Sequence, residues 1–217
     1  MKWIVSMLVF LLSAPAFAAP SLNDLMQQRN IGKPLVSLGL GKPSFKQGAE
    51  YTYKIEGCPV KVVVRDKTSG LVSSLSIPAI PACRGAEFKE YFANQRMPYV
   101  DQVTYGQLNT LLGQGFYKAD CLTGCGNAYD PSVYASWVKM HRPTLTVSTV
   151  LVDGDVLDAS DQWQEVMEKK YGEDFVLEGK FNCTNEFNPS ARVIFQNIKI
   201  SQLTLGAVPY ETNCNRQ

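Results

Sequence analysis

Six cysteines are the residues of this sequence whose spacing most directly points to chemistry. They are Cys58, Cys83, Cys121, Cys125, Cys183 and Cys214. Closely spaced thiols can hold a metal, exchange disulfides or form a structural bridge. Cys121 and Cys125 are one residue further apart than the C-x-x-C pair of thioredoxin-like redox sites, and zinc would need further paired ligands although His141 is the only histidine. We therefore expect no metal and no cofactor, and we interpret this pair as a structural bridge.

An even number of cysteines predicts that all six are joined in disulfides. Six cysteines allow fifteen pairings. We expect the nearest-neighbour set, because each pair then encloses a local hairpin or loop: Cys58 with Cys83, Cys121 with Cys125, and Cys183 with Cys214. In the chain-entropy model, closing each of the two longer loops stabilises the fold by about 3 kcal/mol.

Nucleophilic catalysis finds little support in the sequence. A serine or cysteine nucleophile needs a neighbouring base, and His141 would have to serve alone. The chain contains no G-x-S-x-G nucleophile elbow. Catalysis by a pair of Asp or Glu residues, as in glycosidases, stays an alternative, because the sequence alone does not show whether two carboxylates face each other. We predict no catalytic residues.

Aromatic side chains near the Cys121–Cys125 pair are the candidate binding residues. Tyr129, Tyr134 and Trp137 lie in or just after this segment, and aromatic residues on a rigid loop dominate many protein–protein contacts. Tyr51 and Tyr53 alternate along a predicted strand and are second candidates for contact with a partner. The alternative is that these rings pack in the core over the sheet.

The first 18 residues have the features of an export signal. Lys2 precedes an apolar run over 3–12, and Ala16-Phe17-Ala18 is an A-x-A processing site. The run is shorter than the roughly 20 residues that span a bilayer, so we predict cleavage after Ala18 and no stable membrane insertion afterwards. We expect a periplasmic protein, with secretion as the alternative.

The charge balance argues against nucleic acid as a partner. The full chain has a formal net charge of +1, and removal of Lys2 with the signal leaves the mature chain neutral. Nucleic-acid-binding proteins carry clustered basic residues, whereas the basic residues here are scattered singly or in pairs. The expected partner is another exported protein.

Periodicity and capping residues predict an α+β fold with antiparallel sheets and short helices on one face. Ser21 and Thr104 read as helix N-caps, and an alternating valine run before a turn at 66–70 predicts a hairpin. An amphipathic helix around Trp163 should stop at Gly172. We interpret 174–183 and 191–206 as two further strands, and Asp153-Gly154 as a tight turn between apolar runs.

These elements divide into two helix-plus-sheet modules after the signal peptide of residues 1–18. The first module covers 19–98, and the second covers 99–217 and includes the C-terminal hairpin; both can pack as one domain. The elements recur in a similar order with similar offsets, as expected for a duplicated module. The alternative is chance recurrence of common hairpin chemistry.

The segment LGLGKPSFKQGAEYTYKIEGCPVKVVVRDKTSGLVSSLSI combines a Leu-Gly-x-Pro, a Tyr-x-Tyr and a valine-rich hairpin. Over 35–77, and more loosely over 105–157, the chain resembles small exported modules of the β-lactamase-inhibitor-protein type and the related outer-membrane-assembly lipoproteins. The resemblance implies a tandem helix-and-sheet scaffold whose exposed sheet face and loops bind another protein. The six cysteines and an extension from about Asp158 depart from that family, so no binding residues are carried over.

These observations favour an exported, non-catalytic binding protein. Its expected role is to inhibit or neutralise another envelope or secreted protein, such as a hydrolase or a toxin, in the manner of an immunity protein. Two alternatives remain: a carboxylate-dependent hydrolase of cell-envelope polymer, and an envelope assembly factor.

Overall fold

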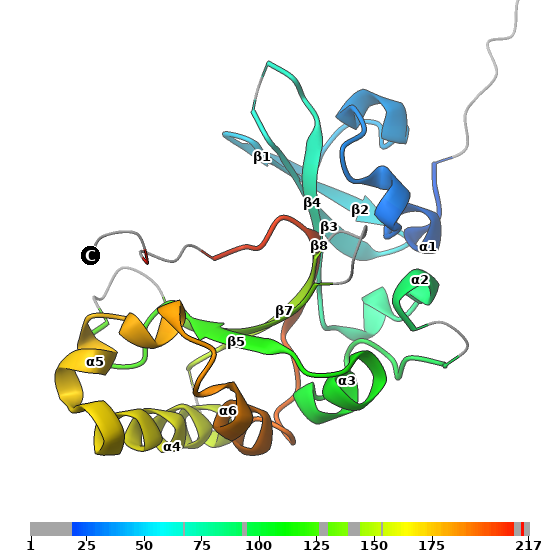
Figure 1. Ribbon diagram of the computed structural model, residues 1–217. Helices are drawn as coiled ribbons and strands as arrows, with labels where there is room; N and C mark the ends of the chain where they lie inside the picture. The colour runs from blue at the N-terminus through cyan, green and yellow to red at the C-terminus, as the bar shows by residue number, and fades with distance from the viewer. Residues whose placement is uncertain are drawn as a thin grey trace, which may run out of the picture.

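The computed structural model describes residues 19–66, 68–92, 95–125, 130–138, 144–152, 154–210 and 214. It shows an α+β protein with one curved, antiparallel, eight-stranded sheet, which confirms the predicted fold class. The helices lie on one side of the sheet, and the segment that follows the last strand lies on the other (Figure 1). The predicted signal peptide lies outside the described residues.

The strands of both predicted modules join in one sheet of order β1-β2-β3-β4-β8-β7-β6-β5. Every neighbouring pair is antiparallel. The strands are β1 (Phe45–Gln47), β2 (Glu50–Ile55), β3 (Cys58–Val64), β4 (Val72–Pro78), β5 (Phe116–Ala119), β6 (Ser132–Trp137), β7 (Thr144–Val150) and β8 (Gln202–Gly206).

Helices pack against this sheet, and all of those described except α4 are short. The α-helices are α1 (Leu22–Leu25), α2 (Lys89–Phe92), α3 (Tyr105–Leu112), α4 (Gly154–Tyr171), α5 (Glu173–Leu177) and α6 (Asn188–Ile194). The 3-10 helices are η1 (Gln28–Asn30), η2 (Leu35–Leu38), η3 (Pro81–Cys83) and η4 (Lys180–Cys183). Both predicted N-caps are confirmed: the Ser21 hydroxyl accepts from the Asp24 amide, and Thr104 forms a capping box with Gln107.

One face of the sheet forms the hydrophobic core with the helices. Across five strands the residues in register on this face are apolar and buried: Val62, Leu75, Leu205, Leu145 and Trp137. The helices add aromatic rings, with Trp163 of α4 in edge contact with Phe181 and Phe195. Both halves of the sheet therefore share a single core.

The predicted C-terminal hairpin is wrong, because most of residues 173–194 are helical. Their apolar residues face α4 instead of alternating along a strand, and Pro189 in the first turn of α6 favours a helix start. Only the end of the predicted hairpin is a strand, β8. The apolar run after Asp153-Gly154 was also misassigned, since α4 begins at Gly154; Asp153 itself lies outside the described residues.

The sheet topology does not show the duplication that we considered. The strands β2–β4 run from one edge toward β8, and β5–β7 run from the opposite edge toward the same strand. Both β4 and β7 pair antiparallel with β8, so they are parallel to each other. The two meanders bury the same face and therefore have opposite hands, whereas copies of one module would share a hand.

All three predicted disulfides are present, and all six cysteines are bonded. Cys58 is joined to Cys83, Cys121 to Cys125 and Cys183 to Cys214. Such a set indicates a protein that folds in an oxidising compartment outside the cytoplasm. None of the helices in the described part of the chain is long and apolar enough to cross a bilayer.

Candidate functional site: the polar face of the sheet

The sheet face opposite the helices is lined by hydroxyl groups. A row of residues in register crosses five strands from β3 to β6: Lys61, Ser76, Thr204, Thr146 and Ser136. Side chains alternate between the two faces of a strand, so this row follows directly from the buried apolar row beside it. Small hydroxyl residues make up four positions of this row, and Lys61 of β3 stands at one end of it.

Hydrogen bonds between neighbouring strands fix the orientation of these hydroxyls. Ser76 Oγ lies 2.8 Å from Thr204 Oγ1, and Ser136 Oγ lies 2.9 Å from Thr146 Oγ1. All four residues are at most 5% exposed. Buried polar groups are stable only when they are hydrogen-bonded, so the pairs give the face a defined pattern of donors and acceptors.

A segment after β8, Ala207–Tyr210, crosses part of this face, and we call it the strap. Its first amide donates to Ser73 O at 2.8 Å. At its other end the Tyr210 hydroxyl lies 3.2 Å from Ser136 Oγ, and the Tyr210 ring packs on Tyr134 with centroids 5.0 Å apart. The disulfide from Cys214 to Cys183 ties the chain down beyond the strap.

Between the strap and strands β2, β3, β4 and β8 lies a cavity of about 290 Å³. Its polar lining includes Ser74, Ser76, Gln202 and Tyr210, and its apolar lining includes Val63, Val208 and Pro209. The lining has one carboxylate, Glu50, and one ammonium group, Lys61, whose charged atoms lie 3.5 Å apart. The cavity is therefore polar but carries no net charge.

Of the aromatic candidates near the Cys121–Cys125 pair, the structure brings only Tyr134 to the polar face. Its hydroxyl donates to Asp120 Oδ2 at 2.9 Å, and it is 8% exposed. Trp137 points to the core, is 3% exposed and donates through Nε1 to Gly113 O at 2.8 Å, so its ring is not available to a partner. Tyr129 lies outside the described residues.

Tyr51 and Tyr53 point to the helix side of the sheet, away from the polar face. Tyr53 is buried, and this burial raises its pKa above the ordinary tyrosine value. Tyr51 is half-buried, with Lys46 Nζ 4.9 Å from its ring centroid. Tyr53 and Trp137 therefore pack in the core, which is the alternative to contact with a partner that the sequence left open.

Cys121 and Cys125 are bonded to each other, as a structural bridge requires. Within the described ranges, no group of three or more His, Cys, Asp or Glu residues is placed to hold a metal ion. His141 lies outside those ranges.

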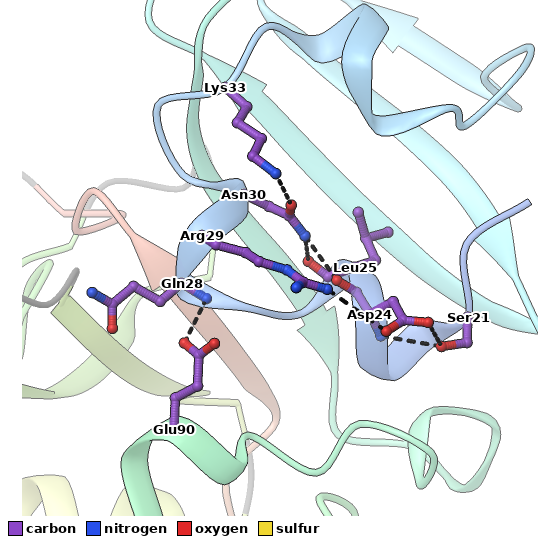
Figure 2. A network of polar contacts seen from close by, with 8 residues as sticks. All are labelled: Ser21, Asp24, Leu25, Gln28, Arg29, Asn30, Lys33 and Glu90. Atoms are coloured by element: carbon purple, nitrogen blue, oxygen red, sulfur yellow. Dashed lines mark hydrogen bonds and ion pairs between the residues drawn. The ribbon is translucent and has the colours of Figure 1, made fainter.

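A second polar cluster, near the N-terminus, has a structural role (Figure 2). The Asn30 amide donates to Asp24 O and to Leu25 O, both at 2.8 Å, and its oxygen accepts from Lys33 Nζ at 3.4 Å. The Gln28 backbone N–H donates to Glu90 Oε2 at 3.0 Å. These bonds tie the N-terminal arm together and to α2.

The hydroxyl row was not identified from the sequence, although its period-two signal is present. Ser74 and Ser76, Thr146 and Ser148, and Gln202 with Thr204 alternate with buried residues in three strands. The sequence does not indicate that β8 inserts between β4 and β7, and this insertion assembles the row. Comparisons of the chain with protein-family models, with curated proteins and with solved structures found no match.

Proposed function

We propose that this protein is an exported, non-catalytic binding protein that holds another exported protein against the polar face of its sheet. The observation that carries the proposal is the sheet face away from the helices, where Glu50, Thr52 and Lys61 are exposed or half-exposed beside the buried hydroxyl row. Antiparallel sheets with one packed face leave the other face free for contacts. The predicted export signal and the disulfides support a periplasmic location.

The lining of the cavity supports binding rather than hydrolysis. Glycoside hydrolysis uses two carboxyl groups across the scissile bond. The cavity on the polar face has one carboxylate, Glu50, which is paired with Lys61. Inhibition or neutralisation of a hydrolase or toxin is the form of binding that we favour, because a rigid, disulfide-bonded scaffold limits the entropy lost on association.

Affinity capture with matched variants tests the proposal. The oxidised mature protein, used on envelope extract and culture medium, should retain one dominant partner at near-equal stoichiometry. Thr52 lies on the polar face beside Lys61, whereas Thr110 is an exposed threonine of α3 on the opposite side. Thr52→Arg should weaken capture at least tenfold because a bulky charge then stands on the contact surface, and Thr110→Arg should not.

Equal capture by both variants would refute the assignment of this face. Turnover of envelope polymer by the purified protein would favour the hydrolase instead, and recovery with washed membranes would favour an assembly factor.

A further inference from the structure

The cavity beneath the strap is lined by the hydroxyl-bearing side chain of Ser74. Ser74 is 6% exposed and lines the cavity. Among the residues that the structure describes, none forms a hydrogen bond with its side chain. The described part of the chain has no buried side-chain nitrogen or oxygen without a hydrogen bond, so the Ser74 hydroxyl oxygen is accessible from the cavity. A bound molecule can therefore donate to it or accept from it.

The other polar groups in the cavity can each both donate and accept, or are balanced by an opposite charge. Ser76 Oγ shares one hydrogen bond with Thr204 and, as a hydroxyl, keeps further capacity. Gln202 donates to Thr204 through Nε2 at 3.3 Å and keeps a carbonyl oxygen. The Lys61 and Glu50 charges cancel, and their side chains are 43% and 48% exposed at the rim.

This lining excludes several kinds of ligand. A free anion would meet the Glu50 carboxylate, and a free cation would meet the Lys61 ammonium group. A purely apolar molecule would leave Ser74 unsatisfied. An extended peptide would find no backbone to pair with, because β3, β4 and β8 are each paired on both sides.

A sugar ring is a kind of ligand that this lining does not exclude. Its hydroxyls both donate and accept, it is uncharged, and its C–H face can pack on an apolar wall such as Val208 and Pro209. The volume of about 290 Å³ is near the lower end of the roughly 300–1,000 Å³ typical of small-molecule sites, which suits one ring. We infer that the cavity beneath the strap binds a single neutral sugar residue, free or at the end of a glycan.

This inference concerns a small molecule and does not depend on the proposed protein partner. Amide NMR spectra of the oxidised mature protein would be recorded with glucose, galactose and N-acetylglucosamine, each added alone, and with phosphate and trialanine as the anion and peptide probes. At least one sugar should shift the amide signals of Ser74, Ser76 and Gln202 in a saturable manner. Phosphate and trialanine should not.

Variants separate a site from a general surface effect. Ser74→Ala should weaken sugar binding on the order of tenfold, the effect of one lost hydrogen bond. Lys61→Met, at the half-exposed rim, should also weaken it, and Ser37→Ala, an exposed serine outside the cavity, should leave it unchanged. Saturable binding of none of the sugars, or preferred binding of phosphate or trialanine in the cavity, would overturn the inference whatever the capture experiment shows.

Discussion

At the scale of single residues, the polar face depends on hydroxyls whose partners lie on neighbouring strands. Ser76 and Thr204 are 128 residues apart in sequence and meet only because β8 pairs with β4. The capping roles of Ser21 and Thr104 were predictable, since their partners lie within three residues. The Ser76–Thr204 contact was not, because nothing local identifies the strand beside β4.

A double-mutant cycle tests the Ser76–Thr204 pair. Either Ser76→Ala or Thr204→Val alone should lower the free energy of unfolding by about 1–2 kcal/mol, because the buried hydroxyl that remains loses its hydrogen bond between β4 and β8. The double variant should lose less than the sum of the two changes. Chemical denaturation measures all four proteins, and fully additive losses would show that the hydroxyls do not interact.

The buried tyrosines predict a loss of stability at alkaline pH. Burial raises the pKa of Tyr117 to about 12, and raises the pKa of Tyr105 still further. Both phenols are neutral in the fold, so the stability that they contribute is complete below pH 10, where unfolded tyrosine titrates. This stability is lost as the pH rises from 10 toward 12, and the loss from Tyr105 continues above that range. The free energy of unfolding should fall over this range by about 1.4 kcal/mol per pH unit for each group.

Replacement of one tyrosine isolates this effect. Tyr117→Phe should reduce the alkaline slope, while Tyr99→Phe, at a residue that is 48% exposed, should leave it unchanged. Denaturant titrations at a series of pH values measure the slope. Identical slopes in the wild type and Tyr117→Phe would show that the Tyr117 phenol does not cause the loss of stability at alkaline pH.

At the scale of elements, side chains from the C-terminal helical region cover the β5 edge of the sheet. The Asn182 side chain accepts from the Ala119 amide at 3.0 Å and donates to Ala119 O at 2.7 Å, as a paired strand would. The Asn188 side chain accepts from the Tyr117 amide at 2.9 Å. Lys118 Nζ donates to Thr184 O at 3.0 Å, and burial lowers its pKa. The edge strand β5 is therefore covered by side chains, which limits pairing with another chain.

Loss of this cover should destabilise the protein and expose the edge. Asn182→Ala leaves the amide and carbonyl of Ala119 without partners, so the free energy of unfolding should fall by about 1–3 kcal/mol. Asn197→Ala, at an exposed asparagine, serves as the control. Chemical denaturation measures the loss, and size-exclusion chromatography should show more self-association for the first variant. Equal behaviour of the two variants would refute the role of Asn182.

The elements show where local patterns predict structure and where they fail. The hairpin of β3 and β4 was predicted because valine alternation and a turn are local signals. The region 173–194 was misassigned because its apolar residues contact Trp163 of α4, and a strand would show a similar density of apolar residues. Tertiary packing therefore decides between helix and strand there.

At the scale of the whole molecule, the three disulfides differ in accessibility. Both cysteines of the Cys58–Cys83 bridge are fully buried. In the Cys183–Cys214 bridge, Cys183 is exposed and Cys214 is half-buried. A dithiol reductant exchanges with a disulfide that it can reach, so Cys183–Cys214 should be reduced well before Cys58–Cys83. Timed alkylation followed by peptide mass spectrometry measures the order. Earlier reduction of Cys58–Cys83 would contradict the structure.

The same bridge should also hold the strap on the polar face. Paired substitution Cys183→Ser with Cys214→Ser should lower the free energy of unfolding by about 3–4 kcal/mol in the chain-entropy model. Proteolysis near Tyr210 should become faster because its contacts with Tyr134 and Ser136 then stand without the tether. Unchanged cleavage would show that these contacts hold the strap without the bridge.

Site-specific photo-crosslinking tests most directly whether the polar face is the binding surface. A photoreactive amino acid would replace Thr52 on the polar face in one protein and Gln162, an exposed residue of α4 on the helix side, in another. Each would be irradiated with the captured partner. If the polar face is the binding surface, position 52 should give a covalent adduct with the partner and position 162 should give none. An adduct from position 162 alone would show that the partner binds on the helix side.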